Sequence, residues 1–326
     1  MTDLTRSAGL TGFIALAASF GLDPVRLARE AHLPVAALTD LDLPITTGHI
    51  ATLLNLAAEK SGVEDFGLRL ADKRRMSNVG PLALLASMQP TLREMIDVLC
   101  RYQRIHSEAL VPVREETPQG MFLRIEISVK DHVAMRQIVE MVLGSICRYV
   151  QATMLTGWRP KAVMFRHVAP IGVTLHRDLF RCAPEFSADF DGLVLEHKDL
   201  ETELNRPDPV LLSYLQAYID QMYARNRATA ADEVRQVIVA LLPAGGCQAD
   251  TVAAHLGINR RTLTRRLAEE GTSFSQLLEI VRAELIEAHL AGKRSFSEVA
   301  ELVGLASRSS LSHWLSRHGK RANSLP

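Results

Sequence analysis

Four arginines lie within seven residues near the carboxyl end of this 326-residue chain: Arg260, Arg261, Arg265 and Arg266. A guanidinium group can neutralise a phosphate, and its planar fork can donate two parallel hydrogen bonds to paired acceptors such as guanine O6 and N7. Arginine clusters are more often solvated helix faces than binding sites. The elements around the cluster therefore decide what it does.

Other chemistry finds little support in the sequence. The eleven histidines include the neighbours His313 and His318 but form no HExxH motif, and His106 is expected to be an ordinary satisfied histidine. The four scattered cysteines, Cys100, Cys147, Cys182 and Cys247, form no CxxC pair and suit a reducing compartment. The apolar settings of Cys100, Cys147 and Cys182 favour buried, inert thiols. Gly-x-Ser-x-Gly, Walker A and Gly-x-Gly-x-x-Gly motifs are absent. We expect no metal, no cofactor and no enzyme.

The arginines fall on an amphipathic helix that follows a tight turn. In "INRRTLTRRLAEE", Leu263 and Leu267 are i,i+4 neighbours that face inward, whereas Arg261, Thr264, Arg265 and Ala268 share another face. The preceding segment, "VAAHLG", has an alanine that permits close helix approach and a glycine four residues later that can adopt positive φ. This pattern predicts a helix-turn-helix.

The same pattern returns 47 residues later. "VAELVG" (Val299–Gly304) repeats "VAAHLG" (Val252–Gly257), and "LASRSSLSHWLSRHG" follows it. Leu311 and Leu315 face inward with Trp314 beside them; the opposite side has Ser309, Ser312, His313 and Ser316. A connecting helix is predicted through Phe274, Leu277, Leu278, Val281, Leu285 and Leu290. One copy alone would be weak evidence, but two copies joined by a helix are specific.

These residues resemble the DNA-binding domain of the AraC/XylS family of bacterial transcription regulators, in "TVAAHLGINRRTLTRRLAEEGTSFSQLLEIVRAELIEAHL" and "SFSEVAELVGLASRSSLSHWLSRHGK". The segments "VGPLALLASMQPTLREMIDVLCRYQRIHSEAL" and "LHRDLFRCAPEFSADFDGLVLEHKDLETELNRPDP" resemble the arabinose-binding-type ligand domain of one AraC subgroup. The chain departs from the family's Gly-x-x-Pro-x-x-Tyr/Trp-Arg ending, with Gly319, Ala322 and Leu325 at those places, and has Leu305 where the family has phenylalanine.

The resemblance implies which residues meet DNA. Base contacts are expected from Arg261, Thr264 and Arg265 in the first unit and from Arg308, Ser309, Ser312 and His313 in the second. Phosphate contacts are expected from Arg260, Arg266, Arg317 and Lys320. The two second helices would enter successive major grooves, about 34–36 Å apart.

The fold expected is an α+β amino-terminal domain, with helices around a small sheet, followed by an all-α domain with two helix-turn-helix motifs. We place an effector-binding and dimerisation domain at residues 1–227 and a DNA-binding domain at 228–326, with the motifs at about 249–270 and 296–317. In the first domain, helices are expected at residues 11–20, 24–30, 46–61, 80–88, 91–109, 131–156 and 209–227. Strands are expected around the turn at 118–120, at 162–166, and at 185–190 with 193–196.

Composition agrees with a folded protein: 47% of residues are hydrophobic and 37 basic residues balance 37 acidic ones. No run of 18 uncharged apolar residues suggests a membrane span, so we expect a cytoplasmic protein. The leading hypothesis is a ligand-responsive, sequence-specific transcription activator. Its expected partners are promoter DNA, a small-molecule effector, RNA polymerase and a second copy of the chain.

Two other hypotheses for the function of the first domain remain open from the sequence. The first domain could be an enzyme fused to a DNA-targeting tail, which predicts convergent acids or nucleophiles in a pocket. Alternatively, it could be a ligand-independent interaction module, which predicts a filled interior. A pocket of roughly 300 Å³ or more would favour the ligand-responsive hypothesis over the module.

Overall fold

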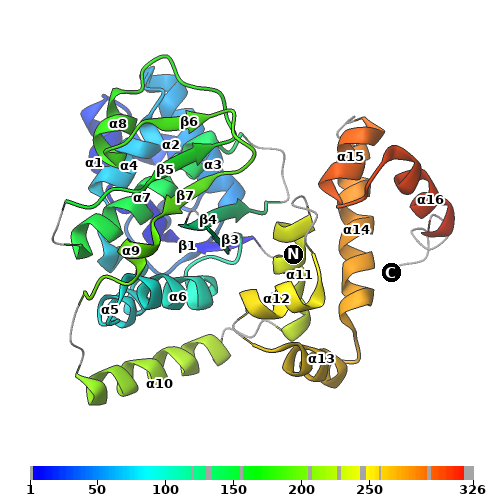
Figure 1. Cartoon of the computed structure of the whole chain (residues 1–326). Coiled ribbons are helices and arrows are strands. Elements are labelled where there is room, and N and C mark those ends of the chain that lie inside the picture. Colours follow the sequence, from blue (N-terminus) through cyan, green and yellow to red (C-terminus); the bar gives the residue numbers. More distant parts are fainter. Residues whose placement is uncertain are drawn as a thin grey trace. The chain divides into compact units, whose positions relative to one another are not determined.

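The computed structural model describes residues 3–118, 120–129, 134–154, 157–204, 208–225, 229–242, 247–256, 258–291 and 295–318. The chain divides into two compact units, Met1–Asn226 and Arg227–Pro326 (Figure 1). Each unit is built around its own buried residues and is described by itself.

Unit 1 is a helical domain around a small sheet. Its helices are α1 (Phe13–Ser19), α2 (Pro24–Glu30), α3 (Thr47–Ser61), α4 (Phe66–Lys73), α5 (Pro81–Ser87), α6 (Leu92–Tyr102), α7 (Arg136–Thr153), α8 (Thr174–Phe180), α9 (His197–Leu200) and α10 (Pro209–Arg225). The short strands β1 (Leu4–Arg6) and β2 (Pro44–Thr46) form an antiparallel pair. The expected α+β class is confirmed.

The larger sheet has five strands in the order β3-β4-β7-β5-β6. They are β3 (Leu110–Thr117), β4 (Gly120–Ile127), β5 (Ala162–Phe165), β6 (Pro184–Phe186) and β7 (Gly192–Leu195). Neighbours are antiparallel except β5 and β6. On β4, alternate residues Met121, Leu123 and Ile125 are buried in the same core as residues of α6 and α7. This face of the sheet therefore meets those two helices.

The structure changes several details of the sequence interpretation. The strands predicted at 185–190 and 193–196 correspond to β6 and β7, which are not neighbours in the sheet because β5 lies between them. The helix expected over residues 91–109 ends at Tyr102, and a 3₁₀ turn, Gln103–Ile105, leads into β3. The helix expected over 131–156 is described only from Arg136 to Thr153; residues 131–133, 155 and 156 lie outside the described residues.

Helix α4, which the sequence reading missed, packs closely against α7. A Cβ added at Gly67 would lie 2.0 Å from the carbonyl oxygen of Gln137, and one added at Gly144 would lie 2.8 Å from side-chain atoms of Leu68 and Ala71. The Gly67 amide also donates to the Gln137 side chain at 2.7 Å. The two glycines thus allow α4 to pack directly against α7, and Arg74, the residue after α4, is buried.

Unit 2 is entirely helical in its described part. It comprises α11 (Ala230–Leu241), α12 (Ala249–His255), α13 (Arg260–Glu269), α14 (Phe274–Ala291), α15 (Phe296–Leu302) and α16 (Arg308–His318). Helix α11 is fixed to its neighbours at two points. Glu270 accepts hydrogen bonds from the amides of Ala230 and Ala231, and Arg235 pairs with Glu284 of α14 at 2.6 Å.

Candidate nucleic-acid interface and ligand cavity

The two helix pairs of unit 2, α12–α13 and α15–α16, have matching turns. The Ile258 amide donates to the Ala253 carbonyl at 3.0 Å, and 47 residues later the Leu305 amide donates to the Ala300 carbonyl at 2.8 Å. Both alanines are 1% exposed. The two turns thus share the same backbone hydrogen bond and a buried alanine at the same position.

The glycine of the second turn has the conformation that its position requires. Gly304 has φ +65°, and a Cβ there would lie 2.9 Å from the Leu242 carbonyl oxygen. Its counterpart, Gly257, lies outside the described residues. Leu305, which stands where the resembled family has phenylalanine, is half-buried against the apolar cluster that includes Val299, Val303 and Leu311.

Helix α13 has one buried and one exposed face. Leu263 and Leu267 are 1% and 0% exposed, and Asn259 caps the helix by accepting a hydrogen bond from the Thr262 amide at 2.8 Å. The residues on the opposite side are exposed: Arg260, Arg261, Thr264, Arg265 and Arg266. All five predicted contact residues of this helix thus reach the surface.

Two of these arginines have exposed acidic partners. Arg260 pairs with Asp250 at 3.0 Å, and Arg265 lies 3.8 Å from Glu269. Exposed ion pairs contribute only about 0–1 kcal/mol. Their guanidinium groups can therefore leave these carboxylates for a phosphate or a base edge at small cost.

Helix α16 repeats this arrangement with different side chains. Leu311 is fully buried, whereas Arg308, Ser309, Ser312, His313 and Arg317 are exposed. Ser307 accepts a hydrogen bond from the Ser310 amide at 3.2 Å and so caps the helix. The Arg308 guanidinium lies 5.9 Å from the centre of the Phe296 ring.

A contact that the sequence did not reveal holds α16 to the connecting helix. The Trp314 indole donates to Glu279 of α14 at 2.7 Å, and the Arg282 side chain of α14 reaches the Val303 carbonyl at 3.3 Å. Gly319 and the residues after it, including the predicted phosphate contact Lys320, lie outside the described residues. The second helix-turn-helix is thus held to α14 by contacts within the described residues.

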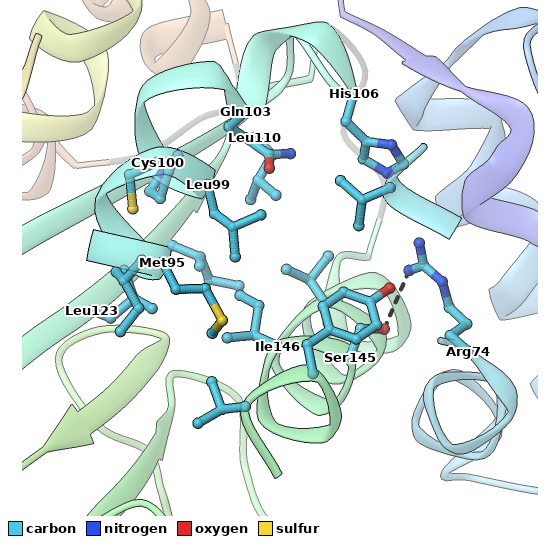
Figure 2. A pocket seen from close by; sticks show the side chains of 17 residues that line it. Arg74, Met95, Leu99, Cys100, Gln103, His106, Leu110, Leu123, Ser145 and Ile146 are labelled. Carbon is cyan, nitrogen blue, oxygen red and sulfur yellow. Dashed lines mark hydrogen bonds between the residues drawn. The ribbon is translucent and has the colours of Figure 1, made fainter. Parts of the chain in front are cut away.

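Unit 1 contains a cavity between α6, α7 and the sheet (Figure 2). Its volume is about 90 Å³. Its apolar lining comprises Val79, Met95, Ile96, Leu99, Leu110, Pro112, Leu123, Ile125, Val142, Ile146 and Val150. This volume is below the roughly 300 Å³ typical of small-molecule sites. The cavity therefore does not reach the size that would favour the ligand-responsive hypothesis over the interaction module.

Polar groups lie toward one side of this cavity. Figure 2 shows Arg74, His106 and Ser145 on one side and Met95, Cys100 and Leu123 on the other. Arg74 is 7% exposed and donates from Nη1 to the Ser145 hydroxyl at 3.2 Å. Among the described residues, Arg74 forms no ion pair with a carboxylate, and its Nε has no hydrogen-bond partner.

Three more buried polar atoms of the lining residues have no partner in the described chain: Gln103 Nε2, His106 Nδ1 and Tyr149 Oη. Burial, and then the charges of Arg74 and Arg6, lower the pKa of His106 to about 3. His106 is therefore neutral at pH 7. The expectation of an ordinary, satisfied histidine is wrong at this position because Nδ1 is buried without a partner.

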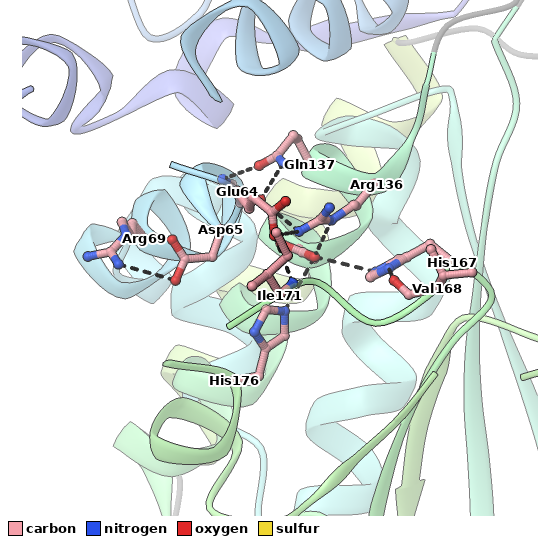
Figure 3. Close-up of polar contacts among 11 residues, drawn as sticks. Glu64, Asp65, Arg69, Arg136, Gln137, His167, Val168, Ile171 and His176 are labelled. Carbon is pink, nitrogen blue, oxygen red and sulfur yellow. Dashed lines mark hydrogen bonds and ion pairs between the residues drawn. The ribbon is translucent and has the colours of Figure 1, made fainter. Parts of the chain in front are cut away.

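A second polar cluster surrounds the fully buried side chain of Glu140 on α7, and Figure 3 labels its members Arg136, His167 and His176. Arg136 donates to Glu140 Oε1 at 3.0 Å, and Nε2 of His167 and His176 lie 3.4 and 3.3 Å from the same oxygen. No group of three or more potential ligands in the described chain has the arrangement of a metal site. Because Arg136 compensates the carboxylate, we interpret the cluster as a structural link from α7 to α8.

Comparisons with known proteins give a family match in each of the two units. The family described as "Arabinose-binding domain of AraC transcription regulator, N-term" matches residues 21–204, more than half of the chain, and the family described as "Helix-turn-helix domain" matches residues 252–321. The chain belongs to the AraC family of transcription regulators.

A curated relative has the same extent. This AraC-family chain is 27% identical over 312 residues to the HTH-type transcriptional regulator VirS of Mycobacterium tuberculosis, in strains CDC 1551 / Oshkosh and ATCC 25618 / H37Rv. The match covers 94% of this chain and 92% of VirS. Among solved structures, transcriptional regulator CdpR from Pseudomonas aeruginosa matches with a TM-score of 0.49 and 20% identity, over 95% of this chain and 93% of CdpR.

The AraC-family chain is thus a transcription regulator with helix-turn-helix DNA-binding elements. The described lining of its cavity has no carboxylate, and burial raises the pKa of the Cys100 thiol to about 12. None of the helices in the described ranges combines the length and apolar character needed to cross a membrane.

Sequence reasoning found the exposed residues of this AraC-family protein and missed those of its cavity. The exposed residues lie within single helices, where a period of 3.6 residues separates inside from outside. The cavity's polar residues come from the end of α4, the turn after α6 and the middle of α7. The apolar lining includes Val142, Ile146 and Val150 of α7, within the helix that the sequence predicts at residues 131–156.

Proposed function

We propose that this protein is a ligand-responsive, sequence-specific transcription activator that places α13 and α16 in successive major grooves of promoter DNA. The observation that supports this most strongly is the pair of matching turns 47 residues apart, each followed by a helix with an exposed polar face. Tandem motifs joined by one helix suit two grooves on one face of the duplex, about 34–36 Å apart.

Base contacts are proposed for the exposed residues of both second helices. In α13 these are Arg261, Thr264 and Arg265, of which Arg265 is the best candidate to pair with guanine O6 and N7. In α16 they are Arg308, Ser309, Ser312 and His313. A bidentate arginine–guanine pair contributes about 1–3 kcal/mol of discrimination, so α13 would supply most of the direct reading.

Phosphate contacts are proposed for the charged residues that flank these faces: Arg260, Arg266 and Arg317, together with Lys320 beyond the described residues. Such contacts fix the register without reading sequence and make binding depend on salt. The exposed positions of the three arginines support this role.

Unit 1 is proposed to be the effector-binding and dimerisation domain, and unit 2 the DNA-binding domain. The effector would favour one arrangement or association state of the protein and so alter how RNA polymerase is engaged at the promoter. The unpartnered polar atoms around the cavity support a ligand at this place, because buried polar groups are normally hydrogen-bonded.

The outward face of α10 supports self-association. Val210, Leu211, Tyr214 and Tyr218 form a stripe at helical spacing with exposed fractions of 47–72%, whereas Ile219 on the other face is fully buried. A second copy presents the same stripe, which suits a two-fold interface. Tyr214→Arg should shift the mass measured by light scattering toward the monomer, and Ser213→Arg, outside the stripe, should leave it unchanged.

The first test is binding of the full-length protein to DNA upstream of its own and adjacent operons over a salt series. We expect tight, salt-sensitive binding to one region that Arg265→Ala weakens. Equal affinity for random DNA would contradict a sequence reader. Promoter occupancy and in vitro transcription are then compared with and without candidate effectors; identical values with the true effector would contradict the ligand response and the activator role.

A ligand-independent interaction module is the second candidate, and the small cavity volume favours it. It predicts that no small molecule binds unit 1 and that promoter occupancy is constant across an effector screen. The unpartnered polar atoms argue against it, because a permanently filled interior leaves such atoms unsatisfied at a cost.

A further inference from the structure

The cavity of unit 1 has an unpaired buried cation at its polar end. Two arginines whose charges act on His106 differ in this respect: Arg6 pairs with Asp42, whereas Arg74 has no carboxylate partner among the described residues. Burying a charge is costly unless it is paired. The missing partner of Arg74 is therefore an anion.

Other residues that line the same cavity have donors that suit an anionic acceptor. Tyr149 Oη and Gln103 Nε2 both carry donor protons without an acceptor in the described chain. Neutral His106 can donate one further N–H. The described lining contains no carboxylate, so within it no acidic side chain competes with a bound anion for these donors.

The apolar part of the cavity determines which chemical group the bound anion can have attached to it. Away from Arg74, the lining consists of apolar side chains of α6, α7 and β4, such as Leu99, Ile146 and Leu123. A wholly polar molecule would lose hydration there without gaining hydrogen bonds. The volume of about 90 Å³ limits the buried part to a short hydrocarbon or a small ring, with the flexible Met95 able to adjust the space.

We propose that this cavity binds a small amphipathic monocarboxylate. Its carboxylate is held by the planar guanidinium of Arg74, with Gln103 and Tyr149 as further donors, and its hydrocarbon part lies among the apolar residues. This inference rests on the proposed ligand response and adds to it the chemical class of the effector.

The test uses isothermal titration of the full-length protein with probes of matched shape. Hexanoate, butyrate and benzoate represent the proposed class; hexanamide removes the charge, acetate removes the hydrocarbon, and butyl phosphate changes the anion. We expect a carboxylate of the first group to bind at least about tenfold more tightly than hexanamide and acetate. Equal binding of the neutral amide, tighter binding of butyl phosphate, or no carboxylate binding at millimolar concentration would overturn the proposal.

Substitution at Arg74 separates a ligand role from a structural one. Arg74→Met keeps most of the side-chain length and removes the charge, so it should weaken carboxylate binding at least about tenfold, leave hexanamide unaffected and raise the melting temperature of the ligand-free protein. Arg74→Lys should retain part of the binding. Arg69→Met, on the same helix but paired with Asp65 at 2.6 Å, is the matched control and should bind as the wild type does.

A lower melting temperature of Arg74→Met with unchanged carboxylate affinity would assign Arg74 to structure and overturn the proposal. If this variant does not fold, Tyr149→Phe replaces it, since it removes only the unpartnered hydroxyl; unchanged affinity there, together with no preference for carboxylate over amide, has the same meaning.

The ligand class and the ligand response fail in different ways. If no carboxylate binds but another molecule changes promoter occupancy, the class is wrong and the response stands. If hexanoate binds through Arg74 but no compound changes occupancy or transcription, the site stands and the response is wrong.

Discussion

Helices α13 and α16 occupy equivalent places in the two halves of unit 2, yet their outward faces differ. Each follows a turn closed by a hydrogen bond onto a buried alanine, and each buries a leucine, Leu263 or Leu311. The exposed face of α13 is rich in arginine, whereas that of α16 is mostly serine and histidine. The buried residues that position each helix and the exposed residues proposed to contact DNA are thus different, so substitutions can change them separately.

Substituting the buried leucines that α13 and α16 have in common should have the largest effect. Leu263→Ala and Leu311→Ala each remove a side chain that is at most 1% exposed, which should lower the free energy of unfolding of unit 2 by about 2–5 kcal/mol. Chemical denaturation followed by circular dichroism measures this. The two variants should lose similar amounts of unfolding free energy. A loss in only one of them would show that the two helix-turn-helix motifs are not equivalently packed.

The outward face of α13 comes next. Arg265→Ala should weaken binding to the specific site by about 1–3 kcal/mol while changing affinity for random DNA much less. Arg266→Ala, on the same helix, should weaken binding to specific and to random DNA to similar extents, because the role proposed for Arg266 is a phosphate contact. Competition binding at fixed salt measures both. A uniform loss with Arg265→Ala would remove it from the reading face.

The outward face of α16 should respond less. Ser312→Ala removes one neutral hydrogen-bonding group and should cost no more than about 0.5–1.5 kcal/mol of binding free energy. The same competition assay compares it with Arg265→Ala. A larger loss for Ser312→Ala than for Arg265→Ala would reverse the assigned contributions of the two helices.

The smallest effect concerns the ion pair beside α13. Asp250→Asn releases Arg260 from an exposed pair at 3.0 Å and should strengthen DNA binding by no more than about 1 kcal/mol. Repeating the substitution in an Arg260→Gln background completes a double-mutant cycle. If Asp250→Asn still strengthens DNA binding in the Arg260→Gln background, the effect comes from removing a negative charge near the DNA and not from breaking the ion pair.

How far the sequence predicts this protein depends on whether a feature is local. The α+β class, the two helix-turn-helix units and helix Pro24–Glu30 follow from short-range periodicity and capping, with Asp23 accepting hydrogen bonds from the first-turn amides of that helix. Helix α4 was missed because its significance is tertiary: Gly67 matters through its contact with Gln137, seventy residues away.

The cavity shows the same limit at a functional site. Arg74 and Tyr149 are unremarkable in the sequence, and their polar atoms become significant only because folding buries them without partners. The order of β6, β5 and β7 likewise depends on long-range pairing, which local alternation does not specify.

The most direct test of the account is methylation protection of guanine N7 in DNA bound by the full-length protein. We predict two protected major-groove segments on one face of the duplex, roughly 10 bp apart, one of which is lost in Arg265→Ala while the other persists. A single protected segment, or two segments on opposite faces, would contradict the claim that α13 and α16 read successive grooves.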